Sequence, residues 1–183
     1  MGNSVFGHRP PTAGFEVPLE MLSACHFRIE RQCETLRRLL PHLADHGADD
    51  EARAAAAGVV RYFDTSAMDH HADEEEELFP ALIESMAGSD PVCIREMTSS
   101  LVAEHRELEA LWRRLRKSLQ AVVAGEGVTL DADTVQAFAS LYARHIEREE
   151  KELLPMAGRL LGDEELGRIG RAMRERRGID SVD

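Results

Sequence analysis

The chain has 183 residues, and its 34 Asp and Glu residues outnumber its 22 Lys and Arg residues, which gives a formal net charge of -12 at pH 7. This length is typical of one domain whose core needs no disulfide or metal staple to fold. The negative charge repels nucleic-acid phosphates and anionic lipid headgroups, so we expect no nucleic-acid and no membrane partner. The expected partners are small molecules, cations or proteins.

The cysteines and the hydropathy pattern indicate a cytoplasmic protein. Cys25, Cys33 and Cys93 form no CxxC pair, and their odd number argues against a disulfide framework. Residues 1–16 contain no apolar stretch long enough for a signal peptide. No segment approaches the roughly 18 consecutive apolar residues that a membrane-spanning helix needs.

Gly and Pro residues are sparse in four long stretches and collect between them, which is typical of helices joined by loops. We therefore predict helices at residues 19–44, 50–86, 91–124 and 131–161. Pro91 suits a first helical turn, and Asp131 suits an N-cap. Short connections favour an all-α fold, an up-down-up-down four-helix bundle with a short extra C-terminal helix at residues 163–177. The predicted parts are an N-terminal segment, the bundle, and an amphipathic C-terminal helix with a tail, at residues 1–17, 18–161 and 162–183.

Apolar residues recur in steps of three and four along each predicted helix, which marks the face that turns toward the core. A single histidine interrupts each apolar stripe, and in the second and fourth helices a glutamate follows one turn later. These residues are His26, His70 with Glu74, His105, and His145 with Glu149. A buried carboxylate without a partner costs several kcal/mol. A metal ion shared by these groups is the simplest way to satisfy them.

The spacing also suits metal coordination. Residues i and i+4 lie on one face of a helix, so each His-x3-Glu pair presents a nitrogen and an oxygen to the same site. With His26 and His105, the two pairs supply four imidazoles and two carboxylates, an inventory with which helical bundles build dinuclear sites. Nitrogen and oxygen donors without thiolate favour iron or manganese and accept zinc, whereas calcium and magnesium prefer more oxygen.

These motifs resemble those of hemerythrin-like, or HHE cation-binding, domains. The resemblance spans residues 18–161 and is carried by His26 in "ACHFRIE", His70 and Glu74 in "HHADEEEELFP", His105 in "AEHRELE", and His145 and Glu149 in "HIEREEKELLP". It implies a four-helix bundle with a non-haem di-iron centre held by these six residues. Two bridging glutamates would leave about four open positions on the two irons, of which an oxide or hydroxide bridge would take two.

Other polar residues lie close to the motifs in the sequence. Glu30 and Glu109 follow a histidine by four residues but are one position off their stripes, and Glu109 stands where oxygen-carrying hemerythrins have a further histidine, which argues against simple oxygen carriage. His71 and Glu75 are about 100° around the helix from the motif pair, so we expect them behind the ligands or at the surface. Whether Glu30, Glu109 or His71 contacts metal stays open. We expect a solvated Glu76, an inert Cys25 thiol, packing roles for Tyr142 and Trp112, and no role for His8, His42 and His46.

Three functions are compatible with such a site. The favoured one is a di-iron protein that binds a small diatomic ligand, O2 or NO, for sensing, delivery or detoxification. The second is a di-iron redox enzyme that scavenges peroxide or NO or repairs iron clusters, which would turn over with an added reductant. The third is iron or zinc storage, or a structural metal whose removal would lower the melting temperature without any response to air or NO.

Overall fold

A computed structural model describes residues 14–86, 92–127 and 129–179, and within these ranges the chain is helical and contains no strand. The predicted first-turn residue Pro91, His8 and most of the N-terminal segment lie outside the described residues. In chain order the elements are α1 (Pro18–His46), α2 (Asp50–Asp64), α3 (Ser66–Ala72), the π-helix η1 (Asp73–Leu78), α4 (Phe79–Ser85), α5 (Val92–Val123), α6 (Ala132–Arg148), the π-helix η2 (Glu149–Leu153), α7 (Leu154–Leu160) and α8 (Asp163–Arg176).

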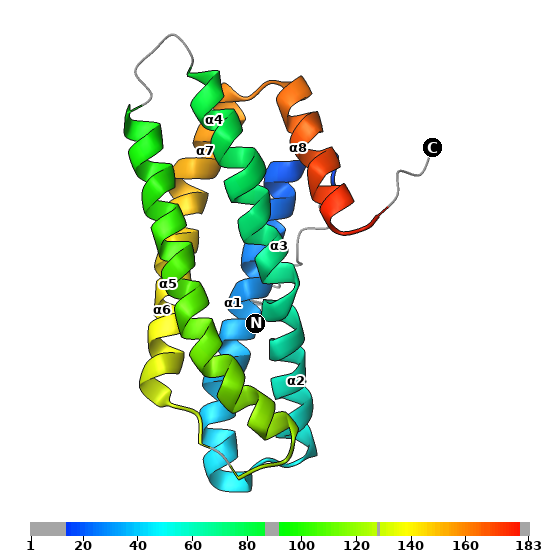
Figure 1. The fold of residues 1–183 in the computed structure, drawn as a ribbon, viewed down its shortest axis with the longest axis vertical. Coiled ribbons are helices and arrows are strands. Elements are labelled where there is room, and N and C mark those ends of the chain that lie inside the picture. Colours follow the sequence, from blue (N-terminus) through cyan, green and yellow to red (C-terminus); the bar gives the residue numbers. More distant parts are fainter. Residues whose placement is uncertain (1–13, 87–91, 128, 180–183) are drawn as a thin grey trace, which may run out of the picture.

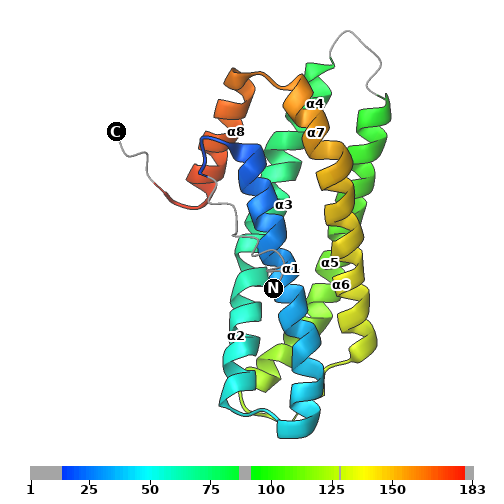
Figure 2. The same cartoon turned by 180° about the vertical axis from the view of Figure 1, so that it is seen from behind.

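The long helices pack side by side along one axis, as Figures 1 and 2 show. Helix α1 contacts α2 and α6, and α5 contacts the same two helices, so their contacts form a closed ring. The α2 run continues through α3 and η1 into α4, and the α6 run continues through η2 into α7. Helix α8 packs outside this ring, against η1 and α1. The all-helical bundle expected from the sequence is therefore present.

The helix ends follow from local sequence chemistry. Asp49 caps α2 because its side chain accepts a hydrogen bond from the Ala52 amide, and Asp131 caps α6 in the same way, as predicted. Pro18 occupies the first turn of α1, where its missing amide hydrogen is not needed. Helix α1 ends at Gly47, whose φ of 67° is a left-handed conformation that glycine adopts without strain.

The two predicted long helices that carry the His-x3-Glu motifs are not regular α-helices throughout. Each contains a wider π-helical turn at its glutamates, η1 in one and η2 in the other. Such turns rotate the residues that follow and occur frequently at functional sites. After η2, Leu154 and Ala157 are buried, whereas Met156 is only partly buried and packs against the edge of the core.

Two apolar clusters make up the described core. One surrounds Phe63, Trp112 and Phe138 in the half formed by α2, α5 and α6. The other surrounds Leu22, Leu101 and Ile169 in the half that α4, α7 and α8 close. The buried histidines and glutamates belong to neither cluster. None of the described helices is both long and apolar enough to cross a membrane.

Candidate metal centre

All six predicted site residues meet in the interior of the bundle. Each side chain is at most 2% exposed, and together they come from α1, α3, η1, α5, α6 and η2. They fall into two groups whose ligand atoms lie within 4.8 Å of one another: His26, His70, Glu74 and Glu149 in one, and His105, His145, Glu74 and Glu149 in the other. We call His26 and His70 the first half-site, and His105 and His145 the second half-site.

The two glutamates lie between the half-sites and face both of them. The Oε1 atom of Glu74 is 3.5 Å from His70 Nε2, while its Oε2 atom is 3.3 Å from His105 Nε2. Glu149 repeats this arrangement, with Oε2 at 3.0 Å from His26 Nε2 and Oε1 at 3.1 Å from His145 Nε2. Each carboxylate therefore presents one oxygen to each half-site, which is the geometry of a bridging ligand.

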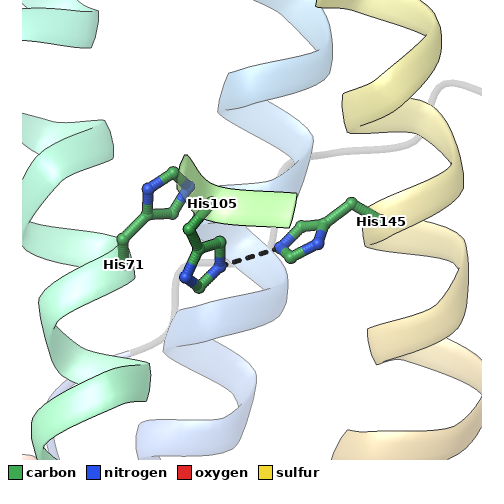
Figure 3. Close-up of side chains that lie close together, drawn as sticks. All are labelled: His71, His105 and His145. Carbon is green, nitrogen blue, oxygen red and sulfur yellow. Dashed lines mark hydrogen bonds between the residues drawn. The ribbon is translucent and has the colours of Figure 1, made fainter. Parts of the chain in front are cut away.

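The donor atoms fit a metal ion better than they fit one another. Buried polar atoms are normally hydrogen-bonded. Several buried ligand atoms of this site, however, have polar neighbours but form no hydrogen bond of normal geometry. Among the described residues these are His26 Nε2, both ring nitrogens of His70, and both oxygens of Glu74 and of Glu149. The Nε2 atoms of His105 and His145 lie 3.0 Å apart and face each other (Figure 3). A cation between the Nε2 lone pairs and the carboxylate oxygens would satisfy all of these atoms except His70 Nδ1, so the chemistry of the donor set fits a bound metal.

The groups that would bind metal influence one another's ionisation. Burial alone would raise the pKa of Glu74, but the imidazoles of His70 and His105 hold this pKa well below its usual value. Burial alone would also raise the pKa of Glu149, but its contact with His145 lowers this pKa. In turn, burial alone would lower the pKa of His145, but Glu149 outweighs it and raises the pKa to about 9. Without metal, a proton on His145 thus compensates part of the buried negative charge.

The two histidines of helix α3 differ from the other three, because among the described residues no carboxylate accepts a hydrogen bond from their Nδ1 atoms. Burial lowers the pKa of His70 to about 4. Burial, reinforced by the neighbouring His105 and His70, lowers the pKa of His71 well below its usual value. Both rings are therefore neutral near pH 7, and a neutral imidazole has a lone pair that can coordinate a metal.

A layer of carboxylates supports the other three histidines from behind. His26 Nδ1 donates to Glu150 at 2.6 Å. His105 Nδ1 donates to Glu75, and His145 Nδ1 donates to Glu104, both at 2.8 Å. A hydrogen bond to one ring nitrogen fixes the tautomer and leaves the other nitrogen free for metal. Glu75 lies behind the ligands, which is one of its two predicted places, whereas the roles of Glu104 and Glu150 were not predicted.

The repeat contained a signal for part of this layer. Glu75 and Glu150 occupy equivalent positions in the two motif copies, each directly after a glutamate that faces the site. Glu104 has no such signal, because it precedes His105 in the chain but contacts His145 on the neighbouring helix. Only the packing of α5 against α6 reveals it.

The sequence left open whether Glu30, Glu109 or His71 contacts metal, and the structure places these three residues differently. Glu30 is exposed, and Glu109 pairs with Arg106, so neither belongs to the groups of potential ligands among the described residues. His71 is only 6% exposed and groups with His105 and His145, so the surface placement is wrong for it.

The residues expected to have other roles also have defined places. Tyr142 is buried, as expected of a packing residue, and Trp112 packs in the core while its indole nitrogen donates to Asp64. Cys25 is buried and burial raises its pKa, which keeps the thiol protonated. Glu76 is exposed, and His42 is paired with Asp49 away from the site.

Helix α8 attaches to the π-turn that carries Glu74. Asp73 is fully buried at the start of η1, and Arg177 donates to it at 2.6 Å while Arg176 lies 3.4 Å away. At Gly170, a Cβ atom would come within 2.0 Å of the Phe15 carbonyl oxygen, so only glycine allows this approach of α8 to the N-terminal segment. These contacts were not apparent in the sequence, where Asp73 looks like part of an acidic run.

Fold and site together define a class: a helical bundle with a buried cluster of histidines and glutamates, contributed by its helices, that can hold a metal ion. The profile of the Hemerythrin HHE cation binding domain matches residues 17–157. The chain therefore belongs to this hemerythrin family, as its motifs indicated. It is also similar to a protein of Haemophilus influenzae named "Uncharacterized protein", with 30% identity over 167 residues that cover 91% of this chain and 94% of the other.

Proposed function

We propose that this chain is a non-haem di-iron protein that binds a small diatomic ligand, O2 or NO, for sensing, delivery or detoxification. In this proposal, residues 18–161 form an up-down-up-down four-helix bundle, and His26, His70, Glu74, His105, His145 and Glu149 hold two iron ions. The closed ring of contacts among α1, α2, α5 and α6 supports the bundle arrangement. The family match to residues 17–157 supports the domain boundaries.

The observation that carries the proposal is the division of both carboxylates between the half-sites. Glu74 and Glu149 each direct one oxygen toward His26 or His70 and the other toward His105 or His145. A single ion would need only one of these sets, and the remaining buried donors would stay unsatisfied at about 1–3 kcal/mol each. Two ions that share both carboxylates would use the Nε2 atoms of all four histidines and all four carboxylate oxygens, and manganese or zinc would accept the same ligands as iron.

The surroundings of the site favour a very small ligand. All six proposed ligands are buried. Bound iron would supply open coordination positions to such a ligand. The chain itself orients three of the imidazoles through Glu75, Glu104 and Glu150, and burial of the ligands keeps bulk water away from them.

The first test is iron stoichiometry after anaerobic loading of the stripped protein with ferrous iron. We expect about two irons per wild-type chain and fewer in Glu149→Gln, which loses one bridging charge. Glu152→Gln is the matched control, because Glu152 lies on the same π-turn but is exposed. One iron or none in the wild type would contradict the dinuclear proposal.

The second test distinguishes the functions. Exposure of the reduced, loaded protein to O2 or NO should change its absorption spectrum, and removal of the ligand should restore it. Continuous consumption of peroxide or NO with an added reductant would instead identify a redox enzyme. A loaded protein whose spectrum responds to neither gas would leave iron storage or a structural metal as the function.

A further inference from the structure

Helix α8 lies outside the residues that match the family profile, yet it packs against the turn that carries Glu74. The match covers residues 17–157, and α8 begins at Asp163. Its contacts are with η1 and α1, and Figure 1 shows it beside the run from α3 to α4. The family match therefore does not account for the attachment of α8 to the metal centre.

The acidic side chains of η1 divide between two sides of this six-residue turn. Glu74 faces the buried histidines, and Glu75 accepts a hydrogen bond from His105. The remaining acidic residues pair with arginines in α8 or directly after it. These pairs are Asp73 with Arg176 at 3.4 Å and with Arg177 at 2.6 Å, Glu76 with Arg176 at 2.7 Å, and Glu77 with Arg168 at 3.3 Å. The turn thus contacts the metal centre on one side and α8 on the other.

Asp73 is the buried anchor of this attachment. Its side chain is fully buried, with one carboxylate oxygen bonded to Arg177 and the other facing Arg176. Arg176 also donates to the carbonyl oxygen of Ala72, the last residue before the turn. A buried carboxylate that loses its cation is strongly destabilised, so α8 cannot leave η1 without a change in the turn. Because Asp73 directly precedes Glu74, that change falls beside a proposed metal ligand.

The charges of the turn connect its two sides. The run "DEEEE" places five carboxylates in succession, and among the described residues only Glu74 lacks an arginine partner. The histidines and a bound metal supply its counter-charge. Loss of the metal therefore loosens the turn on one side, and loss of the arginines of α8 loosens it on the other.

We propose that docking of α8 and metal binding at Glu74 are coupled, so that each stabilises the other. This inference rests on the proposed metal-binding function, although it needs only a metal at Glu74. Asp73 and Arg177 are then positioning residues that hold the turn. When the metal leaves, α8 undocks more often and uncovers Ile169 and Met173, which are fully buried in the docked helix. The coupling converts the state of a buried centre into a change at the surface.

The first test is hydrogen–deuterium exchange of the full chain, followed by mass spectrometry in the metal-stripped form and after anaerobic loading with ferrous iron. The amides of α8 should exchange at least about five-fold faster in the stripped form. The amides of α2 are the internal reference and should change less. A general loss of stability would instead accelerate exchange in both helices.

The second test uses the reciprocity of coupling, because α8 must favour metal by the same factor by which metal favours α8. In a chelator competition, Arg177→Ala should bind ferrous iron at least about five-fold more weakly. Charge alone predicts the opposite, since removal of a positive charge favours a nearby cation. Arg171→Ala is the matched control, because Arg171 is exposed on α8 and has no ion pair among the described residues. Leu119→Ala controls for lost stability in the other apolar cluster. Both controls should bind iron as the wild type does.

Three outcomes would overturn the inference. The first is equal exchange of α8, relative to α2, in the stripped and loaded wild type, a comparison that needs no variant. The second is unchanged or tighter iron binding in Arg177→Ala, and the third is an equally large loss of affinity in Leu119→Ala. A wild type that binds iron but gives any of these results keeps the proposed metal function. A wild type that binds no iron would refute that function and this inference with it.

Discussion

Raising the pH should destabilise the metal-stripped protein through His145. This histidine has an ordinary pKa of 6.5, and its contact with buried Glu149 raises the folded-state value to about 9. A raised folded-state pKa contributes stability that is fully present below 6.5 and is lost as the pH rises through 9. The difference of 9 minus 6.5 corresponds to about 3 kcal/mol, and roughly 2 kcal/mol of this should be lost between about pH 6 and pH 8.5. Glu149, Glu150 and Glu74 raise the pKa of His26 well above its usual value, which adds a loss of the same sign.

Bound metal should remove this dependence of stability on pH. A metal ion and a proton compete for the same Nε2 lone pair of His145, so metal binding releases the proton and strengthens as the pH rises. The loaded protein should keep its stability from pH 6 to pH 8.5, while the stripped protein loses it. The contrast between the two forms is the signature of metal ligands, because a surface histidine pair would behave alike in both.

The assay is urea unfolding of both forms at constant ionic strength, with melting curves as a second readout. For a protein of this size, 2 kcal/mol corresponds to a fall in melting temperature of about 4–8 °C. The series stops at pH 8.5 because burial raises the pKa of the Cys25 and Cys33 thiols, which adds a loss of the same sign at higher pH. Stripped His145→Gln should have a shallower profile. A stripped wild-type protein whose stability is flat or rises over this range would refute the reasoning.

Three further predictions concern the layers around the site. Glu104→Gln should weaken metal binding about 10–100-fold in a chelator competition, because His145 loses the hydrogen bond that orients it, whereas exposed Glu147→Gln should not. Arg177→Ala should lower the free energy of unfolding by about 2–3 kcal/mol in urea, because buried Asp73 then retains only the longer contact with Arg176; an unchanged urea midpoint would mean that this pair contributes nothing. Gly170→Ala should displace α8 from the Phe15 carbonyl and speed proteolysis at the C-terminal end, and a wild-type digestion pattern would contradict that contact.

The sequence was sufficient for the helices and for the meeting of the six proposed ligands. His26, His70, His105 and His145 each interrupt an apolar stripe, and a stripe can face only the core of the bundle. Four such interruptions therefore had to come close together once the helices packed. The same argument placed Glu74 and Glu149, since each lies one turn from a histidine on its own stripe.

The sequence was insufficient wherever the outcome depends on the spacing between helices. Glu104 and Glu150 lie off the stripes, and their contacts with His145 and His26 cross from one helix to another. His71 lies about 100° from His70 on an ideal helix, which suggested a surface or outer position. In the bundle, that direction points toward α5 and its ring stacks on His105, so the residue is buried.

The π-turns escaped prediction for a different reason. A wider turn leaves the repeating apolar pattern almost unchanged over a few residues, so the pattern of "HIEREEKELLP" is also compatible with a regular α-helix. The difference appears only downstream, where Leu154 and Ala157 are buried and Met156 is only partly buried. The burial of Asp73 was also not predictable from the sequence. An acidic run such as "DEEEE" usually indicates a solvated face, yet Asp73 and Glu74 within it are fully buried.

The doubled motif has a structural explanation in the way it connects the helices. The helices of His26 and His105 carry no His-x3-Glu pair that faces the site. The glutamate directly after each motif glutamate instead accepts a hydrogen bond from one of these two histidines: Glu150 accepts from His26, and Glu75 accepts from His105. Each support crosses between the half-sites, since Glu75 follows His70 in the chain but serves the second half-site, while Glu150 follows His145 but serves the first. Neither half-site is complete without the motif of the other, so the two copies form one centre rather than two independent sites.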